Sequence, residues 1–250
     1  MNDPNCDPAA KGFVACIEDV QKAFGIEEDL FQKYVKGEIK QNEDLIKLIT
    51  LRENCTDWKN EINIPGGGWG TTLNACILYS LVRHYDMDSI IETGVSGGYY
   101  TSFMLAALNQ NNNHGLLTSL EISNDTKEVG KLVPKIELNE GVDWSLNLGK
   151  SSLDHFKEWK QKGIVHCADL YCHDSFHSMG LMLSELTYFK ESTSDNFIVY
   201  MDDQGSENFW NRCLGMNAFR KIGYSVKYIS GQECRAKAHL GGFLKFEKIK

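Results

Sequence analysis

Short apolar runs alternate with helical patterns from Ser89 onward, and this alternation limits the fold more than any other feature. The runs cover residues 89–94, 116–122, 142–148, 168–174, 196–203, 224–230 and 241–248. Apolar residues at helical spacing fill gaps between them, over 100–109, 124–138, 151–162, 177–190 and 207–222. Strands that alternate with helices predict an α/β fold with a doubly wound, mostly parallel sheet of seven strands and helices on both faces.

Two regions of the chain depart from this alternation. The last two runs are joined without a convincing helix, which predicts an antiparallel pair at the sheet edge. Residues 1 to about 60 carry apolar side chains at helical spacing and no strand-like run. We therefore divide the chain into an N-terminal helical region or lid, 1–63, and a Rossmann-like domain, 64–250, that binds the ligand.

Composition excludes several classes of protein. The 250 residues carry a net charge of −8 and a pI of about 5.4, which argues against the nucleic-acid backbone as a partner. No apolar run approaches the roughly 18 residues of a membrane span, and the first residues lack the pattern of a signal peptide. The eight cysteines are scattered, so we expect reduced thiols in a cytoplasmic protein. A zinc site in the Cys- and His-rich run 166–177 is the alternative.

A cluster of glycines follows the first apolar run, where a parallel strand would pass into a helix. The sequence there is IIETGVSGGYYTS, with Gly94, Gly97 and Gly98. A dinucleotide turn would show G-x-G-x-x-G and a phosphate loop would end in Gly-Lys-Ser/Thr, and neither pattern is present. Glu92 would repel a pyrophosphate, but it suits a ligand that carries an amino group. A tight turn that needs glycine for its backbone alone is the alternative.

Acidic residues end several of the other runs as well. Glu121 ends the second run, where a carboxylate can accept hydrogen bonds from both hydroxyls of a ribose. Asp174 ends the fourth run, and Asp202 and Asp203 end the fifth. Because the carboxyl ends of parallel strands meet at one sheet edge, these three aspartates would repel each other unless a cation lies among them.

Carboxylate ligands suit a hard cation, Mg²⁺ first, and such an ion could acidify a substrate hydroxyl. His177, three residues after Asp174, could then remove the proton. The alternatives are that Asp174 and Asp203 are N-caps of the helices that follow them, and that His177 is an ordinary core or surface histidine.

The spacing E-x-G-x-x-x-G from Glu92 to Gly98, followed by Glu121, resembles the first motifs of class I S-adenosylmethionine-dependent methyltransferases. This resemblance implies that the methionine end of the cofactor lies against the glycine turn. The residues that it implies as cofactor contacts are Glu92, Gly94, Ser96, Gly98, Thr101, Glu121 and Ser151. Near Ser151 the family often has Gly-Asp, whereas this chain has Lys150 in the acidic position.

The motif D-x-x-H after the fourth run and the aspartate pair after the fifth resemble a metal-dependent branch. This branch holds the sugar O-methyltransferases of macrolide and aminocoumarin tailoring, of the macrocin and mycinamicin type, and a related cephalosporin-tailoring family. The resemblance implies Asp174, Asp202 and Asp203 as Mg²⁺ ligands, and His177 with Asp174 as catalytic residues. The pair Tyr99-Tyr100 and the N-terminal helical region depart from the pattern.

These resemblances imply methyl transfer to a hydroxyl of a small-molecule acceptor, such as a sugar, without a nucleic-acid or membrane partner. The helical N-terminus could form the interface of a homo-oligomer. Three alternatives stay open. One is a methyltransferase that uses no metal and methylates another atom, and another is a nicotinamide dehydrogenase, against which the missing G-x-G-x-x-G counts. The third is a non-catalytic module with a degenerate methyltransferase fold.

Overall fold

The structure of the protein is a computed structural model. It describes residues 11–53, 71–111, 114–133, 138–164, 167–189, 193–202, 216–229 and 241–249. Within these residues the strands are β1 (Ser89–Thr93), β2 (Gly115–Glu121), β3 (Val142–Leu148), β4 (Ala168–His173), β5 (Thr193–Met201), β6 (Tyr224–Ile229) and β7 (Gly242–Lys248). The helices are α1 (Lys11–Phe24), η1 (Phe31–Lys36), η2 (Ile39–Gln41), α2 (Glu43–Glu53), α3 (Thr72–His84), α4 (Tyr99–Leu108), α5 (Ser152–Gln161) and α6 (Met179–Phe189).

The strands form one seven-stranded sheet in the order β3-β2-β1-β4-β5-β7-β6. The first five strands are parallel, and β7 runs antiparallel to both of its neighbours, β5 and β6. The predicted doubly wound sheet and its antiparallel pair at one edge are therefore confirmed. The strand order reverses between β1 and β4, which is where sheets of this kind bind ligands, beyond the carboxyl ends of their strands.

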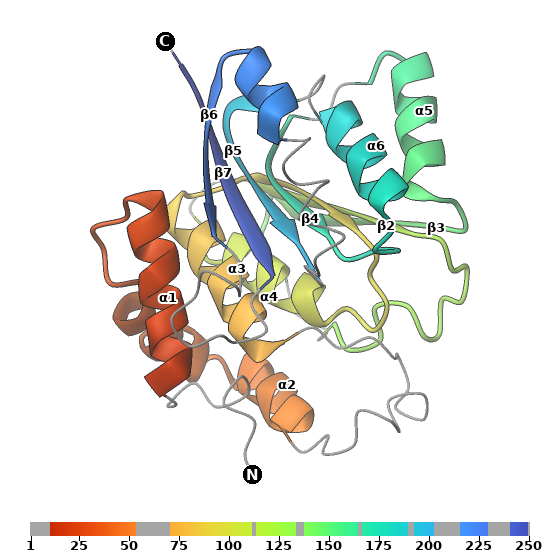
Figure 1. Cartoon of the computed structure of the whole chain (residues 1–250). Helices are drawn as coiled ribbons and strands as arrows, with labels where there is room; N and C mark the ends of the chain where they lie inside the picture. Colours follow the sequence, from red (N-terminus) through yellow and green to blue (C-terminus); the bar gives the residue numbers. More distant parts are fainter. Residues whose placement is uncertain are drawn as a thin grey trace.

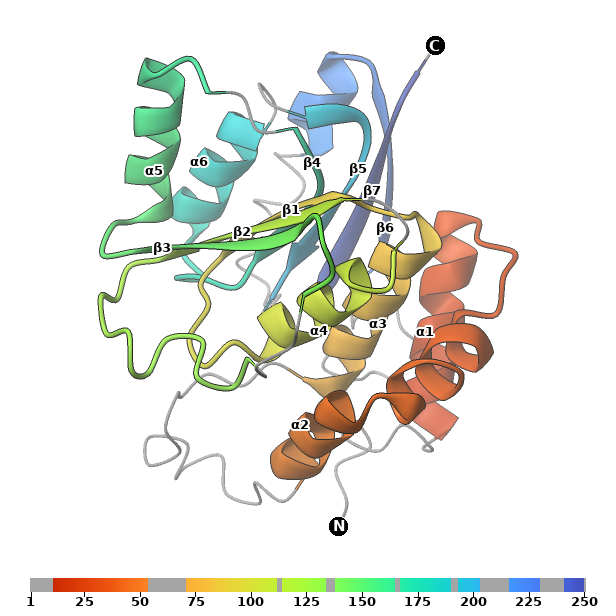
Figure 2. The same cartoon turned by 180° about the vertical axis from the view of Figure 1, so that it is seen from behind.

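Helices cover both faces of the sheet, so the molecule has three layers (Figure 1). The view from behind shows α5 and α6 on one face and the helices α1 to α4 on the other (Figure 2). The inner strands β1 and β4 are buried on both faces, as expected for a sheet covered on both sides. Side chains alternate between the two cores: Leu170 and Cys172 of β4 lie in one core, and Tyr171 lies in the other.

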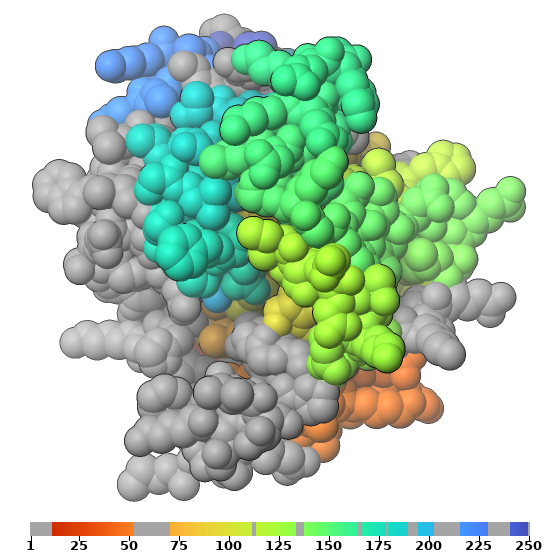
Figure 3. Space-filling view, turned by 90° about the vertical axis from the view of Figure 1, so that its right-hand side faces the viewer, coloured from red at the N-terminus to blue at the C-terminus, as the bar shows by residue number. Residues whose placement is uncertain are grey.

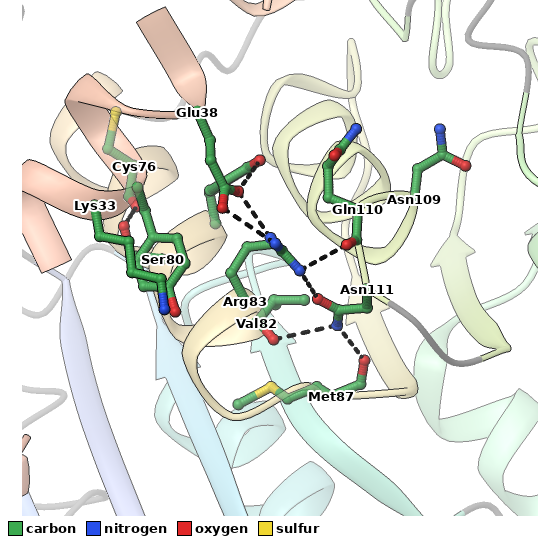
Figure 4. A network of polar contacts seen from close by, with 12 residues as sticks. Lys33, Glu38, Cys76, Ser80, Val82, Arg83, Met87, Asn109, Gln110 and Asn111 are labelled. Carbon is green, nitrogen blue, oxygen red and sulfur yellow. Dashed lines mark hydrogen bonds and ion pairs between the residues drawn. The ribbon is translucent and has the colours of Figure 1, made fainter. Parts of the chain in front are cut away.

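The N-terminal helices pack against α3 and share its core. Glu38 forms an ion pair with Arg83 of α3, at 2.8 Å between Glu38 Oε2 and Arg83 Nε. Arg83 also donates to the carbonyl of Gln110 and to the side chain of Asn111, which follow α4 (Figure 4). Glu38 is thus tied through Arg83 to α3 and to the segment that follows α4. The boundary that we predict between 63 and 64 lies outside the described residues.

Two expectations do not hold in the structure. The stretch 124–133, expected as part of a helix over 124–138, forms turns, because its backbone N–H groups bond to the glycine turn after β1. The cysteines are not all reduced, because Cys16 is disulfide-bonded, whereas Cys76, Cys167 and Cys172 are free. None of the helices in the described part of the chain has the length and apolar character that a membrane span requires.

Candidate active site

The turn after β1 needs glycine because other backbone segments lie against it. Gly94 has φ +82°, and a Cβ built there would lie 2.1 Å from the carbonyl oxygen of Asp174, at the end of β4. Gly98 has φ +86°, and its Cβ would lie 2.6 Å from Val133 Cγ2. Both positions therefore exclude larger residues on backbone conformation and on space. The turn also lies directly against one member of the predicted metal site, Asp174.

Glu121 fixes the shape of this glycine turn. Its Oε2 accepts hydrogen bonds from the backbone N–H groups of Val95, at 2.9 Å, and Ser96, at 3.1 Å. Its Oε1 accepts from the N–H of Ser123 at 2.9 Å. A carboxylate offers about four acceptor positions, so capacity remains for a ligand hydroxyl. Ser96 itself has a left-handed backbone, with φ +46°.

Glu92 lies beneath the turn, with 1% of its surface exposed. Its carboxylate accepts hydrogen bonds from Thr101 Oγ1 at 2.9 Å and from Ser119 Oγ at 2.6 Å. Burial raises the pKa of Glu92 to about 7, although the bonds from Ser119 and Thr101 act to lower it. The carboxylate thus ties β1 to β2 and α4 in this structure. Contact between Glu92 and a cofactor amino group, and contact between Thr101 and the cofactor, stay predictions.

Ser151 caps helix α5. Its hydroxyl accepts a hydrogen bond from the N–H of Asp154 at 3.2 Å and donates to the Asp154 carboxylate at 2.7 Å. Lys150, which stands where the family often has an acidic residue, forms an ion pair with Glu158. Capping explains why a serine stands at this position, and the contact between Ser151 and the cofactor stays a prediction.

Three of the predicted metal-site and catalytic residues come together at the carboxyl ends of β4 and β5. Asp174, His177 and Asp202 each offer one ligand atom, and these atoms lie within 4.8 Å of one another. All three side chains are half-buried. Asp203, the fourth predicted member, lies outside the described residues. Asp174 is not the cap of α6, because the hydroxyl of Ser178 accepts the hydrogen bond from that helix, at 3.3 Å from the Leu181 nitrogen.

Two buried tyrosines donate hydrogen bonds to Asp202. Tyr200 donates to Asp202 Oδ1, and Tyr100 donates to the same oxygen at 3.2 Å. Burial and the Asp202 charge raise the pKa of both tyrosines, so both hydroxyls stay protonated and act as donors at neutral pH. Tyr200 belongs to none of the sequence motifs that predict the site. Its place two residues before Asp202 was a usable signal, because residues two apart in a strand share one face.

A second buried polar cluster lies on the opposite face of the sheet, beneath α5 and α6. Glu185 of α6 is fully buried and accepts hydrogen bonds from Ser152, Tyr171 and His173, the last at 2.6 Å from His173 Nδ1. The His173 ring lies edge-to-face against His177, with centroids 5.9 Å apart. The two helices lie side by side on this face, above the segment that follows β2 (Figure 3). Helical periodicity alone gave no signal for Glu185.

Two other features do not belong to this site. Cys172 is buried within β4 and Cys167 is exposed before that strand begins, so the two thiols do not converge as a zinc site would require. A hollow of about 600 Å³ lies at the amino-terminal edge of the parallel strands, lined in part by Asp88 and Asp169. That edge is opposite the glycine turn.

Comparison with known proteins identifies the fold. The chain matches no protein-family model and no curated protein sequence. It is similar to the solved O-methyltransferase from Bacillus cereus in complex with S-adenosylhomocysteine, with 16% identity and a TM-score of 0.58 over 83% of this chain and 91% of that one.

It is also similar to the O-methyltransferase TomG from Streptomyces achromogenes, involved in tomaymycin synthesis and bound to S-adenosylmethionine. The identity is 16% and the TM-score 0.57, over 84% of this chain and 91% of that one. A Podospora anserina methyltransferase bound to S-adenosylhomocysteine has 14% identity and a TM-score of 0.53, over 86% of this chain and 94% of that one. With this strand order, the chain has the Rossmann-like methyltransferase fold.

Proposed function

We propose that the protein is an S-adenosylmethionine-dependent methyltransferase that methylates a hydroxyl of a small molecule with the help of a divalent cation. The observation that carries this proposal is that the glycine turn lies against the backbone of Asp174, whose side chain belongs to the acidic cluster. The Asp174 N–H donates to the carbonyl of Thr93 at 2.8 Å, and a Cβ built at Gly94 would lie 2.1 Å from the Asp174 carbonyl oxygen. A cofactor on the turn and an acceptor at the cluster would then be neighbours, as direct transfer of a methyl group requires.

The residues around the turn fit an adenosyl cofactor. Glu121 is held by three backbone N–H groups and keeps acceptor capacity for a ribose hydroxyl. Ile122 follows it with 71% of its surface exposed, which offers an apolar face against which an adenine ring can pack. The three solved methyltransferases above are each described with S-adenosylmethionine or S-adenosylhomocysteine bound, which supports the same cofactor class here.

The two carboxylates of the cluster fit a hard divalent cation, whereas the imidazole of His177 is a ligand more typical of transition metals. Two carboxylates and one imidazole have ligand atoms within 4.8 Å of one another. Asp174 and Asp202, with His177 beside them, are the residues that would hold such a cation. When bound, such a cation lowers the pKa of a coordinated hydroxyl and holds it in place.

The chain's own residues then have separate tasks in the reaction. S-adenosylmethionine, when bound, supplies a methyl group on a sulfonium. Glu121 and the glycine turn hold that donor, and Asp174 with Asp202 holds the acceptor end of the site. His177 removes the proton of the acceptor hydroxyl through a ring nitrogen. Most of the acceleration comes from alignment of donor and acceptor.

The structure brings His177 close enough to Asp174 and Asp202 to act as a third ligand instead of as a base. The variant His177→Ala separates these roles. If His177 is the base, the variant loses methyl transfer and keeps the affinity for Mn²⁺. If His177 is a ligand, the affinity for Mn²⁺ falls as well.

The acceptor class is tested by methyl transfer from labelled S-adenosylmethionine to panels of sugars, phenols and amines, with and without EDTA. The proposal expects transfer to a hydroxyl that EDTA abolishes and Mg²⁺ restores. Transfer that survives EDTA would favour the metal-independent alternative. A sugar acceptor of the macrolide-tailoring kind rests on the D-x-x-H motif and the aspartate pair, and the panel tests it directly.

A further inference from the structure

The hydrogen bonds around Tyr100 determine where its proton goes. Its oxygen accepts from the backbone N–H of Thr71 at 3.0 Å and from Asn74 Nδ2 at 3.4 Å. A phenol oxygen has two acceptor positions and one proton, so these two donors use its acceptor capacity. The Tyr100 proton therefore points to Asp202 Oδ1, at 3.2 Å, while the Tyr200 hydroxyl lies within donating distance of both the Tyr100 oxygen, at 2.9 Å, and Asp202 Oδ1.

In the arrangement that gives each group a partner, both phenol hydroxyls donate their hydrogen bonds to Asp202. Tyr200 also has one proton, and its oxygen lies in hydrogen-bond contact with Asp202 Oδ1. With both tyrosines donating to Oδ1, one oxygen of a half-buried carboxylate has two fixed neutral donors. Tyr100 and Tyr200 are 2% and 0% exposed, so water does not compete for these bonds.

The two tyrosines come from different parts of the fold. Tyr200 lies on β5, and Tyr100 lies in the first turn of α4, two residues after Gly98 of the glycine turn. Asn74, which donates to Tyr100, also accepts from the N–H of Gly241 at the start of β7. Rigid elements therefore fix both hydroxyls, and the hydroxyls fix the Asp202 carboxylate.

We propose that Tyr100 and Tyr200 are positioning residues that hold the Asp202 carboxylate for the cation. This inference rests on the proposed function, because it needs a cation at Asp174, His177 and Asp202. Groups that hydrogen-bond to a metal ligand fix its orientation, and their loss typically costs about 10- to 100-fold in metal affinity. The tyrosines would act through Asp202 and would touch neither the acceptor nor the methyl group.

The test is calorimetric titration of Mn²⁺ alone, as the probe, into the full chain and three variants. Tyr200→Phe removes one donor and leaves no other group without a partner, because Tyr100 still bonds to Asp202. We expect at least about a 10-fold loss of Mn²⁺ affinity. Tyr100→Phe is the second variant, with a similar expected loss, so that the test survives if one variant does not fold.

Tyr99→Phe is the matched control. Tyr99 is adjacent in α4 and equally buried, and its hydroxyl bonds to Thr72 Oγ1 at 3.0 Å. We expect Mn²⁺ affinity within about 2-fold of the unaltered chain, with a comparable change in thermal stability. If the buried hydroxyls had a purely structural role, all three variants would lose affinity for Mn²⁺ to the same extent. That result would overturn the inference.

The remaining outcomes separate this inference from the proposed function. If the unaltered chain binds Mn²⁺ and both Tyr100→Phe and Tyr200→Phe bind it equally well, the positioning role is wrong and the cation site stands. If the unaltered chain binds no Mn²⁺, the cation half of the proposed function fails, and the inference fails with it.

Discussion

Glu121 accepts a hydrogen bond from the backbone N–H of Ser96, with 3.1 Å between Oε2 and the nitrogen. This contact joins the end of β2 to the turn after β1, so one carboxylate both shapes the turn and faces the proposed ribose site. Glu121→Ala leaves three N–H groups without their acceptor, and we expect at least a roughly 10-fold loss of S-adenosylhomocysteine affinity in calorimetry.

The control for this prediction is Glu128→Ala. Glu128 lies on the segment after β2 and pairs with Lys131 on the surface, where ion pairs contribute little. Its affinity for S-adenosylhomocysteine should match that of the unaltered chain. Equal affinities for Glu121→Ala and Glu128→Ala would rule out the role that we give to Glu121.

Gly94→Ala should destabilise the protein by more than the cost of placing alanine in a left-handed backbone conformation. The new methyl group would meet the Asp174 carbonyl at 2.1 Å, whereas Gly163, also left-handed with φ +67°, has open space at that position. Gly163→Ala should therefore cost about 1–2 kcal/mol, and Gly94→Ala at least about 2 kcal/mol more. Urea unfolding of both variants measures the difference. Similar losses would mean that the contact with Asp174 is unimportant.

Glu92 should make the stability of the ligand-free protein depend on pH. Burial raises its pKa from 4.5 to about 7, so the folded state holds the proton more tightly than the unfolded state does. The destabilising effect is absent below about pH 4.5, grows as pH rises, and is complete above about pH 7, where it reaches about 3 kcal/mol.

Glu92→Gln removes this titration and keeps the shape of the side chain. The difference in unfolding free energy between the variant and the unaltered chain should change between about pH 4.5 and about pH 7, and it should stay constant above about pH 7. The measurement is urea unfolding at several pH values. A difference that does not vary with pH would show that Glu92 titrates normally in the folded state.

Glu185→Gln should destabilise the fold through the second buried cluster. The carboxylate accepts hydrogen bonds from Ser152, Tyr171 and His173, and an amide supplies a donor where those groups need an acceptor. We expect a loss of about 2–3 kcal/mol in thermal or urea unfolding. Glu158→Gln, which breaks the surface pair with Lys150, should cost less than about 1 kcal/mol. If Glu185→Gln and Glu158→Gln lost comparable stability, the buried hydrogen bonds of Glu185 would not contribute to the fold as we expect.

Periodicity was sufficient to predict the sheet from the sequence. All seven predicted runs are strands, with bounds that differ by a few residues at most, because strands that line a core are short apolar runs bounded by turns. The helix expected over 124–138 failed for a physical reason. Gly130 and Leu132 donate their N–H groups to the carbonyls of Ser96 and Gly97 at 2.8 Å, so tertiary contacts replaced the helical bonds.

The candidate site was only partly predictable. Strand-end carboxylates are visible in a sequence, and Asp174 and Asp202 do meet at one edge. The partners that fix them are set by topology: Tyr100 and Tyr200 are 100 residues apart and meet only because α4 packs near the end of β5. Spacing also gave no means to foresee that Glu92 is completely enclosed by Thr101 and Ser119.

The central claim is that the glycine turn and Glu121 bind an adenosyl cofactor, and calorimetric titration of the full chain with S-adenosylhomocysteine tests it most directly. We predict saturable one-to-one binding with a dissociation constant below about 100 µM, in the range usual for enzyme ligands. An absence of binding heat at millimolar S-adenosylhomocysteine, from a chain shown to be folded, would contradict it.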